Sequence, residues 1–93
     1  MTEIRVQIPA DICSEVERRF FEYKATQDII GYLASREDVR MENLEKYLAI
    51  AENRFTELEL MKEAVTSEFV PDGVVNYGYQ FDFAESTIVY QVS

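Results

Sequence analysis

Apolar residues near the start of the chain alternate with polar ones. Ile4, Val6 and Ile8 occupy every second position, and charged or amide side chains stand between them. A period of two with β-branched residues is typical of a half-buried strand. The pattern therefore predicts a strand over residues 3–8, which Pro9 ends.

From Asp11 onward the apolar positions recur every three or four residues. The first helical stripe consists of Ile12, Val16, Phe20, Tyr23, Ile30 and Ala34. At 100° per residue these positions fall on one side of a helix, so the pattern predicts a helix over residues 11–35. Asp11 is expected to cap its start, and Ser14 with Glu17 matches a capping box one turn later.

The polar stretch 35–40 breaks this register and is short enough to join two antiparallel helices. A second helix is predicted over residues 41–70, with an apolar stripe formed by Leu44, Leu48, Ala51, Phe55, Leu58, Val65 and Phe69. Lys62 falls within this stripe, and its amine is expected to extend to solvent. The sequence Pro71-Asp72-Gly73 then signals a stop and a turn.

The last twenty residues return to a period of two. The alternating apolar positions are Val75, Tyr77, Tyr79, Phe81 and Phe83, followed after a short polar reversal at 84–86 by Ile88, Tyr90 and Val92. Two alternating runs around a short polar segment predict a β-hairpin over residues 75–92.

The predicted order β-α-α-β-β gives one domain, residues 1–93, of the α+β class. We expect a long antiparallel helical hairpin packed on a small antiparallel β-sheet. The N-terminal strand is the only candidate for a third strand, and it pairs either within its own subunit or with a neighbour. The helices are roughly 37 and 45 Å long, whereas a seven-residue strand spans about 23 Å, so the tip near residues 33–44 is expected to project beyond the sheet.

The first helix has a second apolar stripe nearly opposite the first, formed by Phe21, Ala25, Ile29 and Tyr32. A helix with one core contact needs only one apolar face. Two interpretations stay open. Either the helix is sandwiched inside its own subunit, or this stripe is an interface with another copy or a partner.

The C-terminal aromatic residues have two interpretations as well. Their rings either cover the helical hairpin or form a partner surface, for which Tyr77 and Tyr79 are the best candidates because a hydroxyl tolerates an interface. Residues 63–93 contain no Lys or Arg, and base stacking needs neighbouring cations, so a nucleic-acid platform is not expected.

Composition excludes much of the usual catalytic and metal chemistry. The chain has no His and one Cys, so Ser–His–Asp and Cys–His catalysis, Cys/His zinc sites and a disulfide framework are excluded. The carboxylate pairs Glu42–Glu45 and Glu59–Glu63 are expected to be a solvated helix face, and Cys13 a small, semi-buried residue. We therefore predict no catalytic, cofactor-binding or metal-binding residues, and a protein that is not an enzyme.

The charge indicates the kind of partner. With 18 acidic and nine basic residues the net charge is −9, which opposes direct binding of nucleic acid or an anionic membrane and suits a basic protein. No apolar run is long enough to span a membrane, and the lone thiol and the start of the chain suggest the cytoplasm, or the virion and host cytoplasm for a phage protein.

Three functional hypotheses follow. The first is an acidic interaction or assembly protein, a homo-oligomer or a subunit of a larger assembly such as a phage particle. The second is an inhibitor of the anti-restriction or anti-CRISPR kind, which blocks the basic nucleic-acid groove of an enzyme. The third is a protein that sequesters a small ligand between subunits, with Tyr32, Arg36, Tyr77 and Tyr79 as the lining residues.

Overall fold

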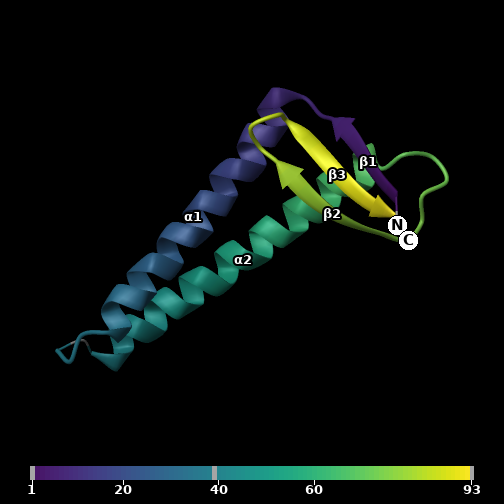
Figure 1. Ribbon diagram of the computed structural model, residues 1–93. Helices are drawn as coiled ribbons and strands as arrows, with labels where there is room; N and C mark the ends of the chain where they lie inside the picture. The colour runs from purple at the N-terminus through teal and green to yellow at the C-terminus, as the bar shows by residue number, and fades with distance from the viewer. Residues whose placement is uncertain (1, 39, 93) are drawn as a thin grey trace.

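The computed structural model describes residues 2–38 and 40–92 and confirms the predicted α+β fold (Figure 1). Its elements follow in the order β1 (Thr2–Gln7), α1 (Ala10–Ala34), α2 (Met41–Phe69), β2 (Tyr77–Asp82) and β3 (Thr87–Val92). The two helices form an antiparallel hairpin, and the three strands form one sheet at its open end.

The sheet has the order β1-β3-β2, and both pairings are antiparallel. The N-terminal strand thus pairs within its own chain, with Thr2 opposite Val92. Residues directly opposite each other share a face of the sheet. The face toward the helices is formed by Ile4, Val6, Tyr79, Phe81, Ile88 and Tyr90.

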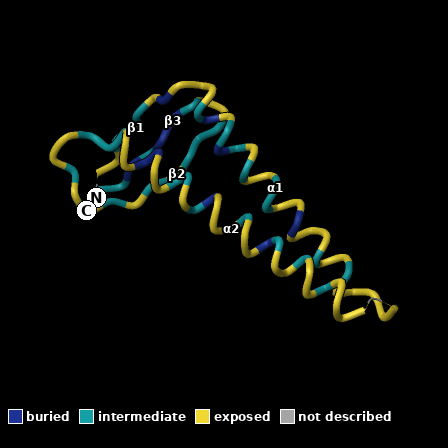
Figure 2. The backbone as a smooth tube through the Cα atoms, turned by 180° about the vertical axis from the view of Figure 1, so that it is seen from behind, coloured by how far each residue is buried: buried dark blue, intermediate teal, exposed yellow. Residues whose placement is uncertain are grey.

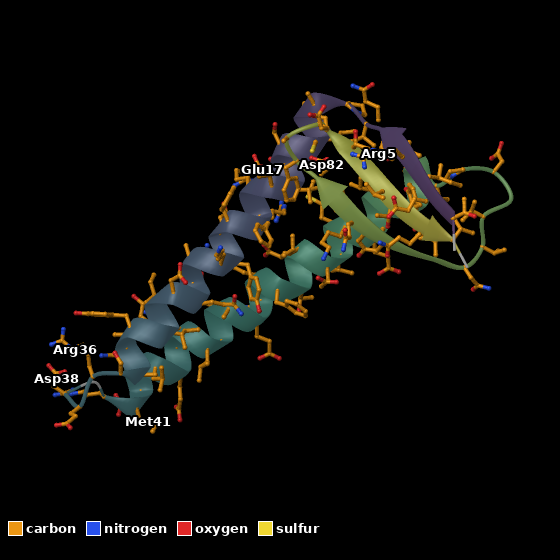
Figure 3. The ribbon with its side chains drawn as sticks, viewed as in Figure 1. Arg5, Glu17, Arg36, Asp38, Met41 and Asp82 are labelled. Carbon is orange, nitrogen blue, oxygen red and sulfur yellow. The ribbon has the colours of Figure 1, made fainter. Side chains whose placement is uncertain are left out.

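The outer face of the sheet is polar and has one cross-strand ion pair. Arg5 on β1 reaches over the central strand, and its Nη2 donates to Oδ2 of Asp82 on β2 at 3.0 Å. Figure 3 shows both residues at the sheet end of the molecule. The Arg5 side chain is 56% exposed and that of Asp82 34%, so the pair contributes little to the stability of the fold, and the two edge strands are held by their pairing with β3.

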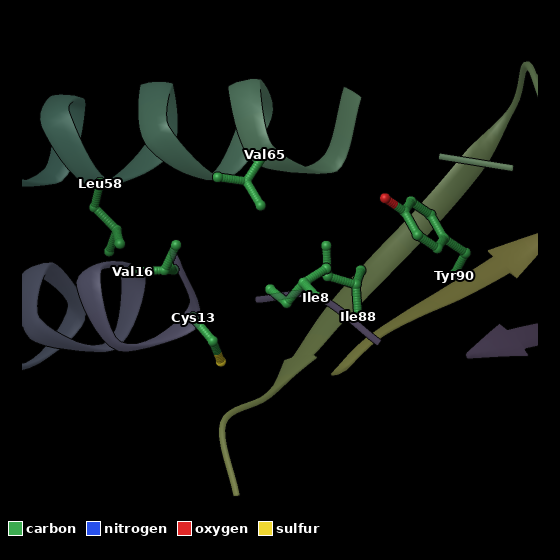
Figure 4. Close-up of a cluster of buried hydrophobic side chains, with 7 residues drawn as sticks. All are labelled: Ile8, Cys13, Val16, Leu58, Val65, Ile88 and Tyr90. Atoms are coloured by element: carbon green, nitrogen blue, oxygen red, sulfur yellow. The ribbon is translucent and has the colours of Figure 1, made fainter. Parts of the chain in front are cut away.

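The core lies between the sheet and the base of the helical hairpin (Figure 4). Its buried members are Ile8, Cys13, Val16, Leu58, Val65, Ile88 and Tyr90. Tyr90 is fully buried, and its hydroxyl donates to the carbonyl oxygen of Thr66 at 2.6 Å. This hydrogen bond connects the central strand to the last turns of α2.

Cys13 is buried more deeply than the sequence suggested, with 2% of its surface exposed. Burial raises the pKa of its thiol, and the nearby Glu17 carboxylate raises it further. The residue is thus a protonated core thiol and not a nucleophile.

The start of α1 differs from the prediction that Asp11 caps it. The helix begins at Ala10, and Pro9 is the N-cap residue, without a side-chain hydrogen bond. Pro9 fits this position because its ring fixes φ and its carbonyl oxygen accepts the first helical hydrogen bond, from the N–H of Cys13 at 3.1 Å. Asp11 lies in the first turn, where its charge still favours the helix dipole, and the expected capping box is inside the helix.

The strand limits also differ from the predicted ones. Val75 precedes β2 and is 87% exposed, and Phe83 belongs to the turn that leads to β3. That turn includes Ser86 at a φ of 48°, and the carbonyl oxygen of Ser86 accepts the N–H of Ile8 at 2.9 Å. Ile8 therefore lies beyond the ladder of β1 but remains in the core. The predicted start of the second helix at residue 41 and end of the hairpin at residue 92 are confirmed, and the remaining limits differ by one residue.

The two helices extend well beyond the sheet and form an arm (Figures 1 and 2). The molecule measures 54 × 26 × 19 Å. The predicted projection of the tip is thus present. Within the predicted connection 35–40, Val39 lies outside the described residues. Neither helix, as described, has a stretch long and apolar enough to cross a membrane.

Replacing Tyr90 with Phe is expected to lower the free energy of unfolding by about 1–2 kcal/mol, because the hydrogen bond to Thr66 is lost inside the core. Urea denaturation measures this change. Tyr79→Phe is the matched control, since Tyr79 lies opposite Tyr90 on the same face of the sheet and is only half-buried. Equal losses in the two variants would contradict the role of the buried hydroxyl.

The raised pKa of Tyr90 predicts that the protein becomes less stable at alkaline pH. Burial raises the pKa of Tyr90 to about 12, from an unfolded value near 10. Between these values the unfolded chain releases the phenolic proton and the folded chain keeps it, so stability falls as the pH rises, by up to about 1.4 kcal/mol per pH unit. Denaturation from pH 9 to 12 is expected to show a steeper loss for the wild type than for Tyr90→Phe; parallel curves would contradict the assignment.

Cys13 is expected to react with a thiol reagent only as fast as the core opens, because its sulfur is buried and protonated. Absorbance of the released chromophore measures the rate, and the urea-unfolded chain is the control. Complete labelling of the native protein at the unfolded rate would show that the thiol is accessible.

Candidate interaction surface

The outer face of α1 exposes the second apolar stripe along the arm. Phe21 is 56% exposed, Ile29 42% and Tyr32 59%, and Ala25 between them is exposed too. We call these four residues the outer stripe. Their contacts within the described chain are local ones on the same side of the arm, Phe21 with Phe20 and Tyr32 with Arg36, and no sheet or second helix covers them. The interpretation that α1 is sandwiched inside its own subunit therefore does not fit this geometry.

The outer stripe is exposed because α1 uses other sides for its contacts. Near the sheet, Cys13 and Val16 point into the core. Further along the arm, Thr26 is buried, and its hydroxyl donates to the carbonyl oxygen of Glu22. Arg54 of α2 also donates to that oxygen, at 3.4 Å, which ties the two helices together.

Tyr32 has a local partner at the tip of the arm. The guanidinium of Arg36 lies 5.4 Å from the ring centre of Tyr32, and its Nη1 donates to the Tyr32 hydroxyl. Arg36 also forms an ion pair with Asp38 at 3.0 Å, which lowers the pKa of that carboxyl. Figure 3 shows Arg36 and Asp38 at the far end from the sheet. The arrangement steadies one edge of the Tyr32 ring and leaves most of it in water.

Tyr77 and Tyr79 lie elsewhere, on β2 against the helices. The ring of Tyr77 packs edge-on against Tyr90 with centroids 5.2 Å apart, and Nζ of Lys62 lies 5.6 Å from the centre of the Tyr79 ring. Burial raises the pKa of Tyr79, and the positive charge of Lys62 opposes this shift. Both tyrosines are half-buried, so their rings help to cover the helical hairpin.

The six predicted interface residues therefore separate into two groups. The outer stripe lies on the arm, and the two tyrosines lie at the sheet end. The same separation applies to the ligand hypothesis, because Tyr32 and Arg36 are at the tip and Tyr77 and Tyr79 are not. No single pocket in the described protomer contains all four of these side chains.

The sequence reasoning missed a second uncovered surface, on the side of the arm that faces the sheet. Leu48 is 48% exposed and Phe55 46%, although the periodicity placed both in the core stripe of α2. Phe20, at the edge of the sheet, is exposed in the same way and touches Phe83 with ring centroids 6.0 Å apart. This exposure could have been predicted from the difference in length between the strands and the helices. The short sheet does not reach the part of each helical core stripe that lies nearest the tip.

These surfaces offer apolar and electrostatic contacts and no obvious reaction chemistry. Among residues 2–38 and 40–92, no three acidic or thiol side chains come together as a metal site. Glu59 of the predicted acidic pairs is bonded to Lys62 at 3.0 Å. Such a surface suits binding to another protein.

Comparison of this chain with protein-family models, with curated proteins and with solved structures gives no match. Its function is therefore inferred from its own surfaces.

Proposed function

We propose that this protein acts through protein–protein contacts, as a homo-oligomer or a subunit of a larger assembly, and that the outer stripe of α1 is its self-association surface. The observation that supports this proposal is the exposure of Phe21, Ile29 and Tyr32 at helical spacing on one side of the arm. A continuous apolar stripe in water is a liability unless another chain covers it. The buried, unpaired thiol of Cys13 is compatible with a cytoplasmic location.

The spacing of the outer stripe suits an antiparallel pair of α1 helices. Phe21 and Ile29 lie four residues before and four residues after Ala25. A two-fold axis at Ala25 places each Phe21 beside the partner's Ile29, and the small alanine lets the two backbones approach closely. The stripe is thus complementary to itself.

Charges beside the stripe favour the same arrangement. Lys24 and Asp28 flank Ala25, and neither forms an ion pair with the described residues of its own chain. Around the proposed axis, Lys24 of each copy lies near Asp28 of the other copy, which gives two ion pairs. These two pairs offset part of the repulsion between two chains of net charge −9.

The exposed area of the outer stripe determines how tightly we expect two copies to associate. Its three large side chains expose roughly 300 Å² per copy, given that an aromatic side chain can bury about 150–250 Å². A standard interface buries about 800 Å² per partner. We therefore expect a weak, reversible association in the micromolar range, unless a larger assembly adds contacts.

The double substitution Phe21→Ser with Ile29→Ser is expected to weaken self-association at least tenfold and to leave the melting temperature nearly unchanged, because both side chains face solvent in the protomer. Sedimentation equilibrium over a wide range of concentration measures the mass against 10.9 kDa for one chain. Leu60→Ser is the matched control, since Leu60 on α2 is 61% exposed outside the stripe. A wild type that stays at 10.9 kDa throughout would overturn the proposal.

A charge swap tests the two-fold arrangement separately. Lys24→Asp alone is expected to weaken the association, because each new aspartate meets the partner's Asp28, and adding Asp28→Lys is expected to restore it. The same sedimentation experiment measures both variants. If the double charge variant does not recover self-association while the Phe21→Ser, Ile29→Ser variant still dissociates, the two-fold axis at Ala25 is wrong. The outer stripe would then still be the association surface.

A further inference from the structure

The sheet-facing side of the arm contains an open groove between the two helices. It encloses about 470 Å³ and is lined on α1 by Tyr23, Gln27, Ile30 and Gly31, and on α2 by Leu48, Ala51, Glu52 and Phe55. We call it the arm groove. The rings of Tyr23 and Phe55 meet across its sheet end with centroids 5.3 Å apart. The arm groove thus continues the helix–sheet interface past the point where the sheet stops.

Gly31 is the unusual member of this groove. A glycine inside a helix is less stable than alanine, and Gly31 has neither a positive φ nor any atom within 4 Å of where a Cβ would be. The fold of the protomer therefore gives no reason for a glycine here. Close approach of another backbone to the groove does give one, because the missing side chain leaves room at the rim.

Acidic side chains follow the groove along α2. Glu52 lines the groove, and Glu45 and Glu59 lie seven residues before and after it, on the same side of the helix. Glu59 is paired with Lys62, but no cation in the described part of the chain pairs with Glu45 or Glu52. A partner that brings positive charge to this side of α2 can form ion pairs with Glu45 and Glu52, whereas a second copy of this chain brings a net charge of −9.

We propose that the arm groove binds an amphipathic helix of a basic partner protein. The apolar side of that helix packs against Leu48, Ala51 and Phe55, its backbone lies close to Gly31, and its Lys or Arg residues face Glu45 and Glu52. A helix suits the site because two antiparallel helices leave a channel along their length that accepts a third helix with anchors at i, i+4 and i+7. This face differs from the outer stripe, so the inference goes beyond self-association.

The proposal is tested with a designed peptide of this chemistry, a helix with leucines at i, i+4 and i+7 and lysines on both flanks. Fluorescence anisotropy compares it with a peptide of the same leucines and glutamate flanks, and with a scrambled peptide of the same composition as the basic one. The basic amphipathic helix is expected to bind at least tenfold more tightly than either control peptide, and less tightly as salt is raised.

Variants of the groove separate specific docking from general attraction to an acidic protein. Gly31→Leu is expected to reduce affinity at least tenfold by filling the rim, and its Cβ meets no atom of the fold. Ala64→Leu is the matched control, because Ala64 is an exposed helical residue outside the groove. Glu52→Gln is expected to weaken binding several-fold, whereas Glu68→Gln, which makes the same change in net charge away from the groove, is not.

The measurements are made in the Phe21→Ser, Ile29→Ser background, so that their outcome does not depend on self-association. Circular dichroism and the melting temperature confirm that each variant is folded. Equal affinity for the basic and scrambled peptides would overturn the inference, as would unchanged binding by a folded Gly31→Leu protein. Either result leaves the outer stripe and its own test untouched.

Discussion

The whole structure depends on the difference in length between the six-residue strands of the sheet and the two helices of 25 and 29 residues. The sheet seals the base of the helical hairpin through Ile88 and Tyr90, and the buried hydroxyl of Tyr90 anchors the central strand to Thr66. Past that base the helices have only each other. The contact between the two helices buries one side of each helix. The other apolar positions of the arm therefore face water or another chain.

The arm therefore presents two uncovered faces of different character. The outer stripe is apolar and self-complementary in spacing, and Lys24 and Asp28 beside it form no ion pair with the described residues of their own chain. The arm groove is concave, with Gly31 on one rim and, on the other, Glu52, which forms no ion pair with the described residues. The first suits an identical chain and the second suits a cationic one, so an assembly built on both faces would contain more than one kind of subunit.

The sequence predicted the element order, the helical hairpin and the projecting tip because periodicity and length are local properties. It was less successful where one element depends on another. Asp11 looked like a cap, but Pro9 ended the strand and began the helix in one step. Leu48 and Phe55 fitted a core stripe, yet periodicity does not tell where the covering sheet ends. The outer stripe of α1 could be predicted from the sequence because its residues lie opposite the core stripe. The open space beside Gly31 could not, because it depends on how α2 packs against α1.

The antiparallel pairing of Thr2 with Val92 brings both ends of the described chain together at the sheet, far from the tip of the arm (Figure 1). Anything fused to either end emerges from the same corner of the molecule. A solid support or fluorescent domain attached there keeps both arm faces free. Energy transfer between labels fused at that corner in two copies would then report how two arms are oriented, since antiparallel arms hold the corners apart and parallel arms bring them together.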